Sequence, residues 1–250
     1  MKFKFSDLLL FSLLFIFVVA FPVDLFPIDE AYRLLIKISL RLCILFYYIY
    51  ICSTKRINIF KFSNLKRLVL FVPFLLACFS NLIAYGFDSS VPMSVNMSES
   101  IFSLLIIYYF LGAVIEEFLF RLFIQSALVN VGSLKRIIYG ALLFALFHLL
   151  NIVNISSVDG LITILIQVVY SFGLGILLGF IYEYTYSLPS CIVFHFIFNF
   201  FNTALYEYLG CVTSDFSFYL TAVVIALVLI IYTFLIYFFV LRKNTRYFKN

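Results

Sequence analysis

The residues best suited to chemistry lie in one short stretch, residues 116–121, which reads EEFLFR. This stretch sits inside an apolar run, 101–129, where an ionised side chain is costly unless it is paired or hydrated. Glu117 and Arg121 are four residues apart, so on a helix they share a face and can pair. Glu116 is rotated about 100° from Glu117 and has no partner on its own helix. Glu116 therefore needs a polar environment from other helices, or it is protonated.

Two histidines supply candidates for that environment, and both lie within apolar segments. His148 ends the stretch Phe144-Ala-Leu-Phe-His, and His195 is followed four residues later by Asn199 on the same helical face. Three amides extend the polar faces around Arg121, His148 and His195, namely Gln125, Asn151 and Asn202. In lipid, three polar stripes reach their lowest free energy when they are buried against one another.

The residue types in this Glu, His and Asn set are those needed for hydrolysis. A carboxylate in a partly dry site can act as a general base on water, and a neutral imidazole can hold the same water. A second imidazole and an amide N–H can stabilise an oxyanion. Counting along each segment places the groups about 10 to 20 Å from the cytoplasmic surface, where a water-filled cavity open to the cytoplasm would hydrate them.

Composition indicates a protein that crosses the membrane many times. Of its 250 residues, 65% are hydrophobic and only 12% are charged, whereas soluble domains carry about twice that charged fraction. The five cysteines show no metal-ligand spacing and no secreted disulfide pattern, so we interpret them as small buried hydrophobes. The net charge of +5 is spread over loops, which is a topology signal and not a nucleic-acid patch.

Apolar segments of about 20 residues predict an all-α, multi-pass bundle of about eight transmembrane helices in the cell membrane. The predicted spans are 5–22, 31–52, 66–86, 101–130, 134–153, 161–183, 188–208 and 216–241. We interpret the first as an uncleaved span and not as a signal peptide. No soluble domain is expected, so 1–250 is one integral-membrane domain with a catalytic core at 100–205.

Charges alternate from loop to loop, and this predicts the orientation. One set of loops is basic and holds Lys2, Lys4, Lys55, Arg56, Lys61, Lys66, Arg67, Lys135, Arg136, Arg242, Lys243, Arg246 and Lys249. The other set is acidic and holds Asp24, Asp29, Glu30, Asp88, Glu99, Asp159, Glu207 and Asp215. By the positive-inside rule the basic loops and both termini are cytoplasmic, which requires an even number of spans.

Two further patterns lie outside the Glu/His set. Gly175 and Gly179 form a small-xxx-small pair that is typical of close helix packing. Arg33, Lys37 and Arg41 share one face of the second span, and the first two are expected to reach the outer interface and pair with Asp29 or Glu30. Arg41 is deeper, and a polar lining or a lipid-headgroup contact is open for it.

The three motifs together resemble those of the CPBP intramembrane proteases, which include the type II CAAX prenyl endopeptidases and the bacterial Abi proteins. That family carries EExxxR, FxxxH and HxxxN on successive spans, and here these read Glu116-Glu117-xxx-Arg121, Phe144-xxx-His148 and His195-xxx-Asn199. The resemblance covers residues 100–205. It implies that Glu116 and His148 activate water, that His195 and Asn199 stabilise the intermediate, and that Glu117 and Arg121 support the site.

The resemblance also leads to expectations for the cofactor and the substrate. The family is often labelled as metalloproteases, yet the HExxH spacing is absent, so no metal is required and zinc remains open. The expected partners are the lipid bilayer and a membrane-associated peptide or protein, cut near the cytoplasmic leaflet, with no nucleic acid. The Trp-free, Phe-rich composition looks bacterial, which favours bacteriocin self-immunity or peptide maturation over prenylated substrates.

A different class of function is open as well. A buried Glu/His cluster can bind a ligand or relay protons in a non-catalytic transporter or immunity protein. Arg121 and Asn199 favour the protease, because a proton relay does not need them. Internal repeats and broken helices would favour transport, and the sequence gives no sign of either.

Overall fold

The computed structural model describes residues 3, 5–60, 65–87, 92–95, 97–155, 157–211 and 215–241. Several charges used above to predict the orientation lie outside the described residues: Lys2, Lys4, Lys61, Asp88, Arg242, Lys243, Arg246 and Lys249. Throughout the described part of the chain the regular structure is helical. The all-helical, multi-pass bundle predicted from composition is confirmed.

Within the described residues, ten α-helices form the framework. Their bounds are α1 Phe5–Ala20, α2 Glu30–Thr54, α3 Phe74–Ala77, α4 Ser80–Phe87, α5 Glu99–Glu117, α6 Ser133–Phe147, α7 Val158–Thr185, α8 Leu188–Asn199, α9 Leu205–Tyr208 and α10 Asp215–Ile236. Short 3₁₀ segments occupy Val23–Leu25, Leu65–Phe71, Leu128–Asn130 and His148–Asn154. Wider π-helical segments continue α5, α8 and α10 over Phe118–Gln125, Phe200–Ala204 and Tyr237–Leu241.

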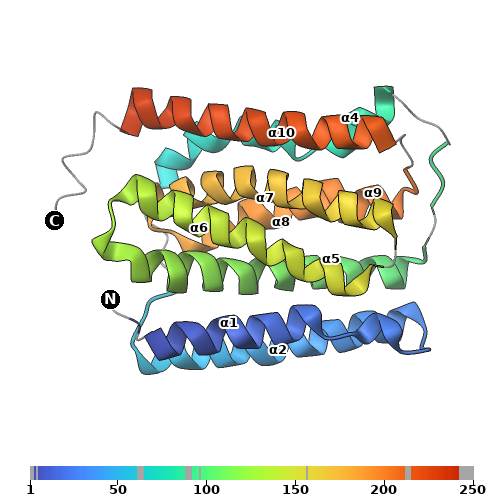
Figure 1. Cartoon of the computed structure of the whole chain (residues 1–250), viewed down its shortest axis with the longest axis horizontal. Coiled ribbons are helices and arrows are strands. Elements are labelled where there is room, and N and C mark those ends of the chain that lie inside the picture. The colour runs from blue at the N-terminus through green and yellow to red at the C-terminus, as the bar shows by residue number, and fades with distance from the viewer. Residues whose placement is uncertain are drawn as a thin grey trace.

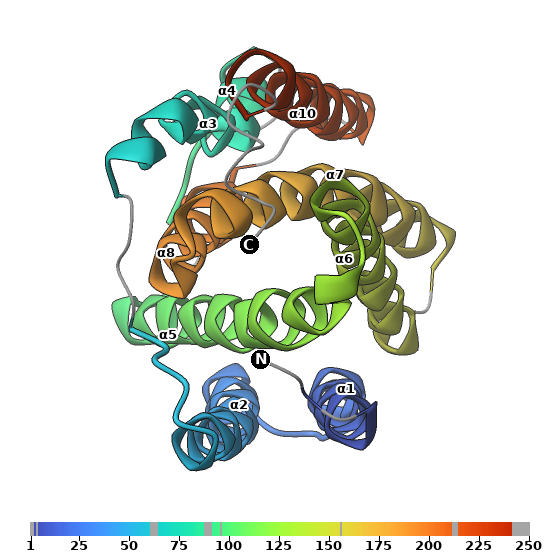
Figure 2. The same cartoon turned by 90° about the vertical axis from the view of Figure 1, so that its left-hand side faces the viewer.

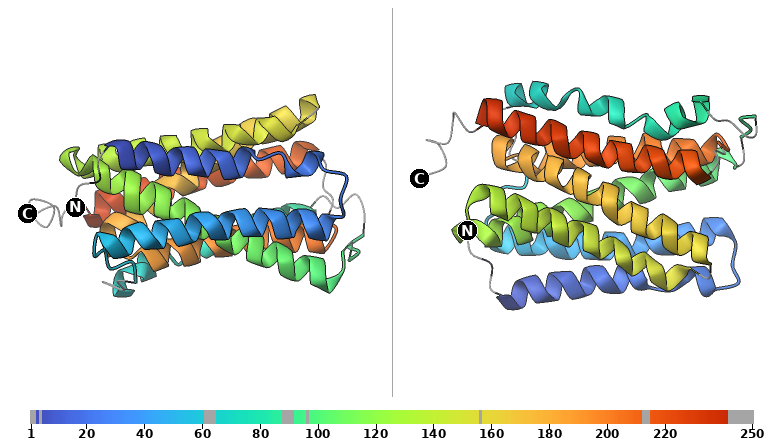
Figure 3. Two further views of the ribbon diagram at one scale, coloured as in Figure 1. Left: turned by 90° about the horizontal axis from the view of Figure 1, so that it is seen from below. Right: turned by 45° about the horizontal axis from the view of Figure 1, so that its top comes forward.

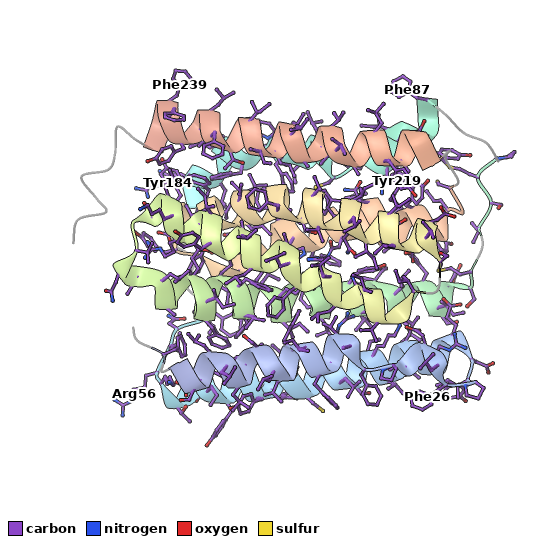
Figure 4. The ribbon with its side chains drawn as sticks, in the orientation of Figure 1. Phe26, Arg56, Phe87, Tyr184, Tyr219 and Phe239 are labelled. Carbon is purple, nitrogen blue, oxygen red and sulfur yellow. The ribbon has the colours of Figure 1, made fainter. Side chains whose placement is uncertain are left out.

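Seven of the eight predicted spans correspond to helices that are long and apolar enough to cross a membrane, counted over the described residues. The exception is the predicted span 66–86, which is divided between a 3₁₀ segment, α3 and α4. Pro73, at the start of α3, explains the first break, because proline has no N–H to donate and disfavours helix at the residue before it. The divided segment still runs beside α10, from the end that holds Arg56 to the end that holds Phe87 (Figures 1 and 4).

Helices pack in three layers. Seen end-on, α1 and α2 form one layer, α5 to α8 form the central group, and α3, α4 and α10 form the third layer (Figure 2). Views from below and from above place α1 with α2 on one outer face and the 65–87 segment with α10 on the other (Figure 3). The central group carries all three motifs, so both outer layers shield it.

The two ends of the bundle differ in charge. α1 begins and α10 ends at the same end, as an even number of crossings requires (Figure 1). That end, here called the basic end, holds Lys55, Arg67 and Arg136 in or beside the ends of helical segments, whereas the opposite, acidic end holds Asp24 and Asp159. The predicted segregation of loop charge is thus present in the described residues. By the positive-inside rule, the basic end is expected to be the cytoplasmic one.

An aromatic cluster fixes the first layer to the motif helix. The Phe11 ring of α1 stacks on Phe123 at a centroid separation of 4.1 Å, and Tyr48 of α2 meets the same Phe123 ring edge-on at 5.0 Å. The Tyr48 hydroxyl donates to the Phe11 carbonyl oxygen at 3.1 Å. Since all three side chains are buried, α1 and α2 form one wall of the core beside the EExxxR segment.

Glycines set the spacing between α6 and α7. A Cβ on Gly175 would lie 3.0 Å from the backbone Cα of Ala141, and one on Gly179 would lie 2.9 Å from Cγ2 of Ile137. These separations confirm that the small-xxx-small pair mediates close packing. The approach matters for the site because α6 leads directly into His148.

Replacing Gly175 by alanine should therefore loosen the contact between α6 and α7. We expect Gly175→Ala to lower the free energy of unfolding by about 1–3 kcal/mol, since the added methyl group meets backbone that cannot rotate away. Thermal unfolding of the detergent-solubilised protein measures this. Gly140→Ala is the matched control, because its Cβ would meet atoms no closer than 3.9 Å. Equal melting temperatures for the two variants would contradict the packing role.

Candidate active site

Glu117 is the centre of the buried polar cluster. Its Oε2 accepts from Arg121 Nε at 3.0 Å and its Oε1 accepts from His195 Nδ1 at 2.8 Å. The Glu117 and Arg121 side chains are fully buried, and His195 is 2% exposed. The predicted pair is confirmed, and the same carboxylate connects the EExxxR segment to the HxxxN helix. π-helical turns follow directly after Glu117 and Asn199, and such turns are frequent at functional sites.

A chain of polar groups, here called the polar ladder, continues from Arg121 toward the basic end. Arg121 Nη1 donates to Gln125 Oε1 at 3.4 Å, and Gln125 Nε2 donates to Glu183 Oε1 at 3.0 Å and to the Gly179 carbonyl oxygen at 3.1 Å. Arg136 Nη2 completes the ladder by donating to Glu183 Oε2 at 2.7 Å. Two buried carboxylates are thus each matched by an arginine, as a low-dielectric interior requires.

Glu183 is a residue that the sequence reasoning missed. It belongs to a 28-residue apolar helix and lies near its basic end, two residues before the helix terminates. The sequence did contain a signal for it: Glu183 lies at the end of its span that faces the basic loops, where an acidic residue would be expected to pair with a cation. Its position shows that Arg136 has a structural role in addition to its contribution to loop charge.

Glu116 differs from Glu117 as its lack of a helix partner predicted. Its nearest charged contact is His195 Nε2, 3.8 Å from Glu116 Oε2, which is longer than a direct hydrogen bond. The Glu116 side chain is 19% exposed, against 0% for Glu117. Glu116 therefore has oxygen atoms free to contact water or a ligand.

The two histidines are oriented through their Nδ1 atoms. His148 Nδ1 lies 2.9 Å from the Phe144 carbonyl oxygen, which can only accept, so Nδ1 carries the proton and Nε2 is free to accept. His195 Nδ1–H donates to Glu117, so its Nε2 points toward Glu116. The Phe144 ring packs between them, 5.0 Å from the His148 ring and 5.6 Å from the His195 ring. The phenylalanine of the FxxxH motif therefore spaces the two imidazoles.

A cavity of about 230 Å³ brings together four of the six predicted site residues. Glu116, His148, His195 and Asn199 line it, whereas Glu117 and Arg121 lie behind its wall. The structure thus separates the six into four that a ligand can reach and two that hold the others in place.

The cavity extends toward the acidic end, which corrects the expectation that it opens to the cytoplasm. Its further polar lining includes Lys37, Gln167 and Thr203, which lie on the acidic-end side of Glu116 and are all partly exposed. On the basic-end side, Arg121 and Gln125 are fully buried. The expectation rested on depth alone, and depth does not reveal that the polar ladder fills the space on the basic side.

Amides beside the motifs take separate roles. Asn151 lines the cavity and donates to Gln167 Oε1 at 3.0 Å. Asn202 does not face the cavity: its Oδ1 accepts from the Ser80 hydroxyl at 2.7 Å, and its Nδ2 donates to the Ala77 carbonyl oxygen. The expected continuation of the His195 stripe to Asn202 is therefore wrong. In a span without water, Asn202 instead satisfies the backbone freed where the 65–87 segment is broken.

The side chains do not fit a bound metal ion. Within the described part of the chain, no group of three His, Cys, Asp or Glu side chains is placed to hold one. His195 Nδ1 and both oxygens of Glu117 are already committed to each other and to Arg121. The steps considered below therefore use only the side chains of the chain.

The fold and cavity define a multi-pass helical membrane protein with Glu, His and Asn side chains from three helical segments around one chamber. Residues 98–201 match the family model described as type II CAAX prenyl endopeptidase Rce1-like. This segment forms an Rce1-like domain and supports the assignment to the CPBP family, which in general terms indicates a CAAX-type intramembrane protease. Comparisons with curated proteins and with solved structures give no significant match.

Removing Arg121 should be far more harmful to stability than neutralising Glu116. We expect Arg121→Met to lower the free energy of unfolding by about 3–5 kcal/mol, because it leaves a fully buried carboxylate without its arginine. Glu116→Gln should change stability little, since Glu116 is partly exposed and makes no short ion pair. Thermal unfolding in detergent compares the two. If Arg121→Met has the same melting temperature as the wild type, the Glu117–Arg121 ion pair does not stabilise the core.

The end of the bundle toward which the cavity opens can be tested by labelling cysteines from each side of the membrane. In a Cys43→Ser background, which removes the exposed native thiol, Thr203→Cys should react with a small membrane-impermeant thiol reagent from the acidic end. Ser133→Cys, at the start of α6 on the basic end, is the control and should react from the opposite side. Intact cells and inverted vesicles present the two sides. Labelling of both cysteines from one side would contradict the geometry.

Proposed function

We propose that this protein is an intramembrane endopeptidase that hydrolyses a peptide bond in a membrane-associated peptide or protein. The observation that carries the proposal is the shared cavity: Glu116, His148, His195 and Asn199 come from three separate helical segments and line one chamber. An Rce1-like domain over 98–201 supports the same class of reaction.

In the proposed reaction, Glu116 and His148 hold a water molecule in the cavity. Glu116 takes one proton from this water, and the oxygen atom of the water attacks the carbonyl carbon of the scissile bond. The carbonyl electron pair moves onto oxygen and gives a tetrahedral oxyanion. His148 suits the holding role, because Nδ1 is committed to Phe144 and Nε2 can accept from the water.

His195 and Asn199 are placed to stabilise that oxyanion. An N–H on His195 Nε2 would point toward Glu116 and the cavity, while Glu117 holds the ring in this orientation through Nδ1. The Asn199 amide adds a neutral donor from the same helix. Glu117 and Arg121 act as positioning residues, because neither lines the cavity.

Collapse of the tetrahedral intermediate completes the reaction. The oxyanion re-forms the carbonyl, the C–N bond breaks, and the proton held by Glu116 passes to the departing nitrogen. One water is consumed, and the products are a new carboxyl terminus and a new amino terminus. Glu116 returns to its starting state, so no other co-reactant is needed.

We further propose a small bacterial peptide as the substrate, in bacteriocin self-immunity or in peptide maturation. The support is compositional: the chain has 34 Phe and no Trp, which looks bacterial and makes prenylated substrates less suitable. The small cavity supports a single extended segment of chain as the occupant.

A non-catalytic proton relay is the second candidate, favoured by the polar ladder that runs from the site toward the basic end. Arg121 and Gln125 interrupt such a route, because guanidinium and amide groups do not change protonation state near neutral pH. The endopeptidase is therefore the better proposal.

Loss of the general base should abolish processing without loss of the protein. We expect Glu116→Gln to lower the rate of cleavage by about 10²-fold or more, and His148→Ala to have a similar effect. Mass spectrometry of peptides released from membranes that express each variant at matched level measures this. Glu99→Gln is the control, because it removes the same charge from the exposed start of α5. Wild-type products from Glu116→Gln would refute the mechanism.

A further inference from the structure

Arg41 is a charged residue of the cavity wall that the proposed reaction does not use. It lies 11 residues into α2, about 16 Å from the helix start, so it is near the middle of a membrane-crossing helix. Its guanidinium is only partly exposed and lines the chamber that Glu116 also lines. A cation at that depth is costly unless something in the site pairs with it.

The Arg41 head group is held firmly but remains without an opposite charge. Nη1 donates to the Tyr108 carbonyl oxygen at 3.0 Å, and the guanidinium carbon lies 3.4 Å from the centre of the Tyr108 ring. Among the described residues no carboxylate forms an ion pair with Arg41. Arg121 and Arg136, by contrast, each have a buried glutamate.

Gly112 makes room for this head group on the motif helix. A Cβ at Gly112 would lie 3.8 Å from Arg41 Cζ, so the guanidinium rests directly over α5. Gly112 and Glu116 are one helical turn apart on the same face. An extended peptide whose scissile carbonyl lies at Glu116 would therefore pass Arg41 about one turn away.

Lys37 adds a second positive charge toward the acidic end. It lines the same cavity, one turn from Arg41 on α2. Its ion-pair partner is the exposed Asp24, at 2.8 Å, and not Asp29 or Glu30 as the sequence predicted. That pair is near the surface, where ion pairs contribute little and exchange readily. Two cations, Lys37 and Arg41, thus lie one after the other along the part of the cavity wall that α2 forms. Glu116, on α5, is the acidic residue of the cavity lining.

We propose that Arg41 is the residue that binds a carboxylate of the peptide substrate, with Lys37 guiding the anion inward. The carboxylate is either the C-terminus of the peptide or an Asp or Glu side chain near the scissile bond. A planar guanidinium suits this ligand because it can donate two parallel hydrogen bonds to a carboxylate. The inference rests on the proposed endopeptidase function and names the feature by which that site selects its substrate.

Binding tests the proposal separately from catalysis. The probes are three short peptides with the same apolar residues, acetyl-Leu-Phe-Leu as the free acid, the same peptide as its C-terminal amide, and acetyl-Leu-Glu-Leu amide. Detergent-solubilised Glu116→Gln protein serves as the binding form, so that no probe is cleaved. Affinity is measured by ligand-dependent thermal shift.

A carboxylate-bearing peptide should bind at least about tenfold more tightly than the plain amide, the ratio that one charge-assisted hydrogen bond provides. Tight binding of the free acid alone identifies a C-terminal carboxylate, and tight binding of the Glu peptide identifies a side chain. Adding Arg41→Gln should remove the preference, whereas Arg41→Lys should keep part of it. Arg33→Gln is the matched control on the same helix, because Arg33 does not line the cavity.

Several outcomes would overturn the assignment. Equal affinity for all three peptides, weak binding of all three, or an acid preference that survives Arg41→Gln would each do so. Arg41-dependent binding of dodecyl phosphate with no peptide preference would assign Arg41 to a lipid headgroup instead. If the preference is present but Glu116→Gln leaves cleavage unchanged in the membrane assay, the endopeptidase proposal fails while the carboxylate site stands.

Discussion

The rest of the site depends on how one fully buried carboxylate is neutralised. Glu117 accepts from Arg121 on its own helix and from His195 on α8, so a single group fixes the relative position of two of the three motif helices. Burying an ion pair in an apolar core is rarely a net gain in stability, but leaving out one partner is very costly. The pair is therefore best understood as a device for geometry: it sets the orientation of the His195 ring, and it leaves the neighbouring Glu116 as the carboxylate that faces the cavity.

This arrangement makes the two sides of the site unequal. Toward the basic end, Arg121, Gln125, Glu183 and Arg136 form a buried chain of hydrogen bonds, in which Arg121 Nη2 and Arg136 Nε are left without a partner among the described residues. Toward the acidic end, amides and cations line an open chamber. The proposed hydrolysis needs water at Glu116, and the chamber on the acidic side can admit it.

Segments outside the Rce1-like domain complete the chamber. The match covers 98–201, yet α1 and α2 supply part of the cavity wall, including Phe15, Lys37 and Arg41. The buried rings of Phe11, Tyr48 and Phe123 hold that wall against the motif helix. On the opposite face, the divided 65–87 segment is held by Asn202. The matched segment thus carries the four candidate site residues that line the cavity, while α1 and α2 complete its wall.

Local pattern was enough to place most of the helices and to pair Glu117 with Arg121, because apolar segment length and i,i+4 spacing are fixed by helix geometry. It also separated Glu116 from Glu117 by rotation alone. Three features required the tertiary structure: the break of 66–86, the partnership of Glu183 with Arg136, and the direction of the cavity. Each depends on which side chain from a distant segment fills a given space, and Asn202 shows why a stripe of polar residues cannot reveal this: its amide faces the freed backbone of the 65–87 segment and not the histidine it follows. The sequence by itself determined the residue types, their depth and their helical faces, whereas only packing between helices decided which of them a ligand can reach.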